Sequence, residues 1–125
     1  QLKIHTMIEE EIFYPAFEGQ IEDDMLDEAR VEHDAAKVLV NDIDAGLPGD
    51  EFFDAKVTVL CEEIRHHVHE EEKRGEGMFA QCRRTGVDLI DLRDRMLERT
   101  RELEQMAQSQ GLPPAMPSTV NLATA

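Results

Sequence analysis

The stretch DEFFDAKVTVLCEEIRHHVHEEE, residues 50–72, decides the fold of this chain. Six of its residues recur at intervals of four and three, so they share one face of a helix. They are Phe53, Val57, Leu60, Ile64, His67 and Glu71. The face carries four apolar side chains and then an imidazole and a carboxylate one turn apart. Because burying these two groups without partners is costly, we expect a ligand that compensates both, and a metal ion does so.

Phase along this helix separates His67 from its neighbouring histidines. His66 and Glu70 have the same spacing as His67 and Glu71, so spacing alone does not choose between the pairs. His66 lies about 100° from the apolar face and His69 about 200° from it. We therefore predict His67 and Glu71 as metal ligands, with His66 at the edge of the site or on the surface and His69 in solvent.

Two further predicted helices, residues 1–14 and 21–45, also direct histidines inward. In the first, His5 and Glu9 repeat the spacing of four, and the same phase selects Glu9 over its acidic neighbours. In the second, His33 falls on the apolar face. The flanking apolar positions are Leu2, Ile12, Met25, Ala29, Ala36 and Val40. Because residues four apart share a helix face, these groups and the pair in 50–72 can meet in one cluster.

Each part of this cluster has a simpler interpretation when taken alone. His33 could be a hydrogen-bonded core histidine, residues 66–72 a solvated helix end, and His5 with Glu9 an exposed pair. All three lie on inward faces, which favours a shared metal site. Mixed imidazole and carboxylate ligands suit iron or manganese, and zinc less exclusively. A ferritin-like site needs Glu-x-x-His on two helices, and the single match, Glu63 to His66, lies off the apolar face.

Helical periodicity through nearly the whole chain predicts an all-α fold. Short connections favour antiparallel neighbours, so we expect an up-down antiparallel helical bundle with an extra C-terminal helix. The expected helices are 1–14, ended by Pro15; 21–45; 50–72, with Asp50 as N-cap; 78–83; and 88–108. The first is about half as long as the second and third, which indicates an N-terminally truncated bundle. We expect residues 1–108 to form the domain and the Pro-containing residues 109–125 to form a flexible tail without a packed partner.

Composition excludes several classes of function. The 125 residues hold 13 Lys and Arg against 28 Asp and Glu, a net charge of −15, which argues against nucleic acid and anionic membranes as partners. No apolar run is long enough to span a membrane. Cys61 and Cys82 form no CxxC motif, so we expect packing roles for both and a cytoplasmic location. No nucleophile triad or glycine-rich phosphate loop is evident, so any catalysis would belong to the metal.

Three blocks of the sequence together resemble a known family. They are HTMIEEEIFYP at 5–15, EH at 32–33 and HHVHEEE at 66–72. In order and spacing they resemble the hemerythrin-like HHE cation-binding domain, over roughly residues 1–105. The resemblance implies a four-helix bundle that holds a non-haem di-iron centre with an oxo or hydroxo bridge.

The resemblance also implies a ligand set. His5 and Glu9 match the second-helix ligands, His33 matches the third-helix histidine, and His67 and Glu71 match the fourth-helix pair. Glu9 and Glu71 would each bridge the two irons. Zinc or manganese could replace iron, or the metal could be absent from the truncated chain.

Three departures from the family pattern matter. The first helix of the family, which carries a further histidine ligand, is expected upstream of Gln1. Oxygen carriers have a second histidine at the position of Lys37, so its absence weakens a simple carrier assignment. The stretch after Glu71 predicts an irregular bulge at the end of that helix.

The expected function is a cytoplasmic di-iron protein that binds or reacts with O2, peroxide or NO. One alternative is an iron- or oxygen-sensing or metal-storage module without turnover, and another is a metal-free structural bundle. If it is an enzyme, it would be an oxidoreductase that consumes peroxide or O2. We expect helix 88–108 or a second copy of the chain, as a homodimer, to cover the groove left by the missing helix.

Overall fold

The computed structural model describes residues 1–73 and 76–120, and within them the fold is all-α, as predicted. The π-helical turn η1 joins α1 to α2, so these three segments form one continuous helical rod. The elements are α1 (Leu2–Ile8), η1 (Glu9–Phe13), α2 (Tyr14–Phe17), α3 (Asp23–Ala45), α4 (Phe53–Glu72), α5 (Met78–Arg83) and α6 (Leu89–Ser109). No helix in the described part of the chain is long and apolar enough to cross a membrane.

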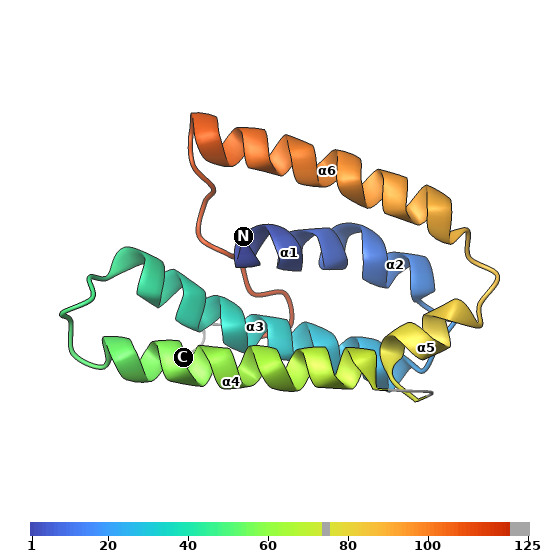
Figure 1. Ribbon diagram of the computed structural model, residues 1–125, viewed down its shortest axis with the longest axis horizontal. Helices are drawn as coiled ribbons and strands as arrows, with labels where there is room; N and C mark the ends of the chain where they lie inside the picture. The colour runs from blue at the N-terminus through green and yellow to red at the C-terminus, as the bar shows by residue number, and fades with distance from the viewer. Residues whose placement is uncertain (74–75, 121–125) are drawn as a thin grey trace.

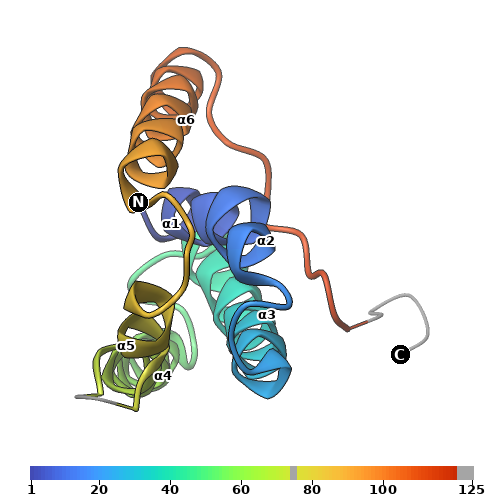
Figure 2. The ribbon, with the colours of Figure 1, turned by 90° about the vertical axis from the view of Figure 1, so that its right-hand side faces the viewer.

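Successive long helices run in opposite directions, which confirms the predicted up-down antiparallel bundle (Figure 1). α3 and α4 form a hairpin, and α5 lies at the end of α4. The view along the helices shows the α1–α2 rod between this hairpin and α6 (Figure 2). The rod therefore contacts both layers and is the central element of the fold.

Two groups of apolar side chains fix the rod in this position. Near its end, Tyr14 and Phe17 are fully buried, with Leu26, Ala29, Met78, Cys82 and Leu92 around them. Near its start, Ile4 and Ile8 pack against Leu103 of α6. The first group ties α2 to α3, α5 and α6, and the second ties α1 to α6. The residues between the two groups belong to η1.

The prediction that the first helix ends at Pro15 is wrong, because the helical rod continues to Phe17. A proline has no N–H to donate, so it normally interrupts a helix interior. Here the π-turn changes the register just before it: the Tyr14 N–H donates to the Glu9 carbonyl, five residues back. Pro15 then falls in the first turn of α2, where a missing N–H is tolerated.

Two smaller predictions about loops and packing are also wrong. Asp50 does not cap α4, which begins at Phe53; its carboxylate instead accepts the Leu47 N–H inside the preceding turn. Cys61 is exposed, whereas Cys82 is buried as expected. The N-cap of α4 is Phe52, two residues later than predicted, and this shift leaves the face of 53–71 unchanged, so the site is unaffected.

The prediction of a tail without a packed partner is wrong for its described part. After α6, the chain turns back past α1 and reaches α3 (Figure 1). Side chains of α3 form hydrogen bonds with residues 115–120. The composition of the tail gave no sign of this, because the contacts are made mainly by its backbone. The predicted bulge after Glu71 falls partly on residues 74 and 75, which lie outside the described residues.

Candidate metal centre

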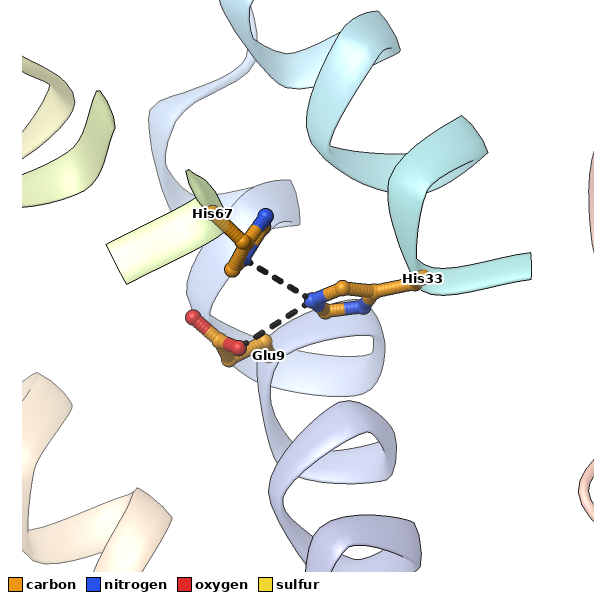
Figure 3. Close-up of side chains that lie close together, drawn as sticks. All are labelled: Glu9, His33 and His67. Carbon is orange, nitrogen blue, oxygen red and sulfur yellow. Dashed lines mark hydrogen bonds and ion pairs between the residues drawn. The ribbon is translucent and has the colours of Figure 1, made fainter. Parts of the chain in front are cut away.

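Three side chains from three different helical segments converge at the centre of the bundle (Figure 3). Glu9 opens η1, His33 lies midway along α3, and His67 lies near the end of α4. His33 Nε2 is 3.3 Å from both Glu9 Oε1 and His67 Nε2. One ligand atom from each residue falls within 4.8 Å of the others, which is a spacing that a single metal ion can bridge.

The two remaining predicted residues extend this group at either end. His5 Nε2 lies 2.7 Å from Glu9 Oε1, and Glu71 Oε1 lies 2.7 Å from His67 Nε2. All five predicted residues therefore form one connected row, with Glu9, His33 and His67 at its centre. The structure brings the five together, and their role as metal ligands stays a prediction.

Several polar atoms of this row have no hydrogen bond within the protein and could instead bind a metal ion. Glu9 Oε1, Glu71 Oε1 and His67 Nδ1 are buried and form no hydrogen bond with any residue that the structure describes. Both carboxylate oxygens are close to an imidazole nitrogen, but not in hydrogen-bond geometry. A buried polar atom left in this state costs about 1–3 kcal/mol. A bound cation would satisfy both carboxylates at once, so the donor set fits the group that the sequence predicts.

The pKa values of the two carboxylates shift in opposite directions. Burial works to raise the pKa of Glu9, but the His33 and His5 imidazoles outweigh it and hold that pKa at about 2. Burial also raises the pKa of Glu71, and the negative charge of Glu9 raises it further, against the effect of His67. Glu9 is therefore the anionic centre of the row, whereas Glu71 competes with it for positive charge.

The three imidazoles of the row hold protons more tightly than usual. The pKa of His5 is raised mainly by Glu9. Burial works to lower the pKa of His33 and His67, but adjacent carboxylates reverse the effect and raise both. Protons therefore compete with a metal more strongly for these imidazoles than for ordinary histidines.

The family model for the hemerythrin HHE cation binding domain matches residues 1–82, more than half of the chain. The chain belongs to this family. Neither a curated protein nor a solved structure matched it. The three residues that converge in Figure 3 all lie within the matched region.

Within this hemerythrin-type bundle, carboxylates approach the outer nitrogens of two histidines. His33 Nδ1 lies 3.0 Å from Glu10 Oε2, so a residue that phase excludes as a ligand instead contacts the opposite side of the ring. His67 Nδ1 lies 3.5 Å from Glu32, beyond a normal hydrogen bond. A carboxylate at Nδ1 orients the ring and leaves Nε2 for a metal. His33 is therefore held more firmly than His67.

The outlying histidines of α4 lie where the helical phase predicts. His66 is exposed and pairs with Glu32 at 3.3 Å, at the edge of the site. His69 is exposed as well. Lys37, at the position where oxygen-carrying hemerythrins have a histidine, is buried and donates to Glu10 at 2.8 Å.

Tyr14 is a member of the site that the sequence did not predict. Its hydroxyl lies 3.0 Å from His33 Nε2, and the side chain is fully buried. Burial raises its pKa, so the hydroxyl keeps its proton. In an α-helix, residues five apart point in different directions, but the π-turn inserts about one extra residue and brings Tyr14 close to the direction of Glu9. A proline inside a longer helical pattern is the signal that could have indicated this.

A groove of about 940 Å³ gives access to the row from the space between α1, α4 and α6. His5, Glu9, His33 and His67 all lie in its wall, which is otherwise mostly apolar. α6 forms one side of the groove, so residues 88–108 cover it only in part. Leu97 and Val68 in the lining are still 47% and 39% exposed. Cover by a second copy of the chain stays a prediction.

Proposed function

We propose that this hemerythrin-family chain binds two iron ions at the Glu9–His33–His67 cluster and uses them to bind or react with O2, peroxide or NO. One observation carries the proposal. Donor atoms of buried Glu9 and His33 and of partly buried His67 converge from three helical segments. Both carboxylates of the row also have an oxygen without a hydrogen bond. Membership of a cation-binding family supports it independently.

Five side chains would hold the metal: His5, Glu9, His33, His67 and Glu71. When bound, iron would supply the redox chemistry that none of these side chains can perform. The protein contributes position and exclusion of water. Glu10 orients the His33 ring, and the apolar groove admits small uncharged molecules more readily than large polar ones.

Tyr14 and Lys37 indicate reaction in preference to simple carriage. The Tyr14 hydroxyl places a proton beside His33 Nε2, within the cluster. Lys37 takes the place of a ligand found in oxygen carriers and directs its ammonium group to Glu10 and Asp34. The site therefore has a nearby hydrogen-bond donor and lacks the imidazole that oxygen carriers have at position 37.

Anaerobic titration with Fe(II), followed by metal analysis and optical spectra after adding O2 or peroxide, tests the proposal. We expect two irons per chain, an oxo-bridge absorption, and consumption of peroxide. His67→Ala should lose the metal, whereas His69→Gln, a change at an exposed neighbour, should keep it. Iron bound without consumption of either oxidant would instead indicate a sensing or storage module.

A chain that binds less than one metal ion, with Fe(II), Mn(II) and Zn(II) each tried, would overturn the proposal. The fold would then be a structural bundle. An equal loss of metal in His67→Ala and His69→Gln would also contradict the site. The comparison of the three metals tests which ion binds, and the comparison of the two variants tests where it binds.

A further inference from the structure

A row of polar side chains on α3 lies beside the metal cluster and contacts the segment after α6. The row consists of Asp34, Lys37 and Asn41, three and four residues apart on one face of the helix. Asp34 is only 1% exposed and Lys37 only 5%. Charged side chains are seldom buried to this extent unless they are paired, so their partners identify what the row binds.

The partners are backbone groups of residues 115–120. The Asp34 carboxylate accepts the N–H groups of Ser118 at 2.9 Å, Thr119 at 2.6 Å and Val120 at 3.2 Å, and also the Thr119 hydroxyl. The Asn41 amide both donates to and accepts from Ala115, at 2.8 Å each way. This segment, which has no regular secondary structure, is thus fixed at both of its ends by α3.

The middle of the same segment connects to the metal cluster. Lys37 Nζ donates to the Met116 carbonyl at 2.9 Å and to Glu10 Oε1 at 2.8 Å. The Ser118 hydroxyl donates to the same Glu10 oxygen at 3.0 Å. The other oxygen of Glu10 lies 3.0 Å from His33 Nδ1. Only one side chain, Glu10, therefore separates residues 115–120 from the His33 ring.

We propose that residues 115–120 form a strap that positions Glu10 and, through it, the His33 ring at the metal cluster. The strap and Lys37 hold Oε1 of Glu10, so Oε2 stays directed at Nδ1. With Nδ1 held by the carboxylate, the Nε2 side of the ring faces Glu9 and His67. Glu10 is thus a positioning residue, and the strap is the element that keeps it in place.

This inference rests on the proposed metal site for its consequence, but the strap itself can be tested without metal. Release of the strap would remove one donor from Glu10 Oε1 and one acceptor from Lys37, and would admit water to both. Glu10 would then be free to leave His33. A strap that only covered the polar row would not affect the His33 ring.

Asn41→Ala tests the connection, because Asn41 contacts the strap but neither Glu10 nor a predicted ligand. Asp42→Asn is the matched control, since Asp42 is exposed and pairs with Lys56 on α4. In the metal-free chain, amide exchange of Ala115, Ser118, Thr119 and Val120 reports attachment of the strap. Nitrogen NMR of His33 reports the hydrogen bond at Nδ1.

We expect the wild-type amides to be protected and Asn41→Ala to speed their exchange by about 10-fold or more. The Nδ1 signal of His33 should shift in the same variant, and Asp42→Asn should match wild type in both measurements. Unprotected amides in wild type would overturn the strap. Fast exchange in Asn41→Ala with an unchanged His33 signal would overturn its positioning role.

Metal affinity supplies the second readout. Glu10→Ala should weaken Fe(II) or Co(II) binding by about 10- to 100-fold, and Glu10→Gln by less, because a glutamine oxygen can still accept from Nδ1. Glu11→Gln, at an exposed neighbour paired with Arg99, should have no effect. Equal affinity in Glu10→Ala and wild type would contradict the proposal. Absence of metal from wild type would refute the proposed function and leave the exchange and NMR results to decide the strap.

Discussion

The two His-xxx-Glu pairs of this protein have the same spacing but different surroundings. In both, an imidazole Nε2 lies 2.7 Å from the carboxylate four residues later. The His5 side chain is 61% exposed, however, and the His67 side chain only 12%. The pKa of Glu9 is lowered to about 2, whereas that of Glu71 is raised. Local spacing therefore sets the distance within each pair, and the neighbouring helices set its burial and charge.

The difference arises from what each carboxylate faces. Glu9 lies between two imidazoles, its own His5 and His33 from α3. Glu71 contacts one imidazole, that of His67, and its pKa is raised by burial and by the negative charge of Glu9. The two pairs are therefore related by sequence but are not interchangeable in the folded protein.

Removing each histidine should give the largest difference between the pairs. His67→Ala takes away a proposed ligand at the centre of the cluster. We therefore expect metal affinity to fall by more than about 100-fold, beyond what loss of an outer hydrogen-bond partner costs. His5→Ala removes the exposed end of the row and should cost less. Metal titration measures both. Equal losses would show that exposure does not distinguish the pairs.

Neutralising each carboxylate should change the stability of the metal-free protein differently for the two pairs. Glu9→Gln removes a buried anion whose pKa is held at about 2 by the His33 and His5 imidazoles, so the variant should be less stable at neutral pH by about 1–3 kcal/mol. Glu71→Gln should be neutral or stabilising, since burial already favours the uncharged form of Glu71. Urea unfolding at pH 7 compares the two. A greater loss in Glu71→Gln would contradict this order.

Gly77→Ala should disturb the α4 pair alone. A Cβ on Gly77 would lie 2.8 Å from the carbonyl oxygens of Glu70 and Glu71 and 2.7 Å from the Lys73 nitrogen. Because these are backbone atoms, the end of α4 must shift, at a cost of about 1–3 kcal/mol. We expect a lower Tm and weaker metal binding. Gly49→Ala, where a Cβ meets nothing within 4 Å, is the control and should leave metal binding unchanged.

The pH dependence of stability should give the smallest effect. The raised pKa values of His5, His33 and His67 mean that the folded protein binds protons more tightly than the unfolded chain. Their contribution is full below about pH 6.5, the unfolded value, and is lost as the pH rises through the folded values. The contribution of Glu9 acts in the opposite sense, being present above about pH 4.5 and lost as the pH falls towards 2.

Metal-free stability should therefore decline as the pH rises above about 6.5. Over the same range the increase in Tm on adding metal should grow, because metal and protons compete for the same nitrogens. Thermal unfolding with and without metal, across this range, measures both trends. His67→Gln should flatten the decline more than His69→Gln does. A metal-free Tm that rises through this range would count against the charged cluster.

The sequence predicted the bundle and the row of five residues because both depend on helical phase. The apolar face of 53–71 placed His67 inward and His66 and His69 outward, which is how they lie. Tyr14 was missed because the π-turn breaks the period on which that reasoning depends. Glu10 was excluded as a ligand, but its contact with His33 joins residues 23 positions apart, and no local pattern reports it.

The strap shows the same limit more clearly. Asp34 and Asn41 bind backbone groups of residues 115–120. Because nearly every residue type has the same backbone groups, the sequence does not indicate which of them a side chain will bind. By itself, then, the sequence determined which face of α4 turns inward, because periodicity is a local property of the chain. The inward placement predicted for His5 is wrong, since its side chain is 61% exposed. Only the tertiary structure decided the direction in which each carboxylate pKa shifts, which histidine is exposed and what holds Glu10. These depend on burial and charge contributed by segments that are distant in sequence and meet only in the folded bundle.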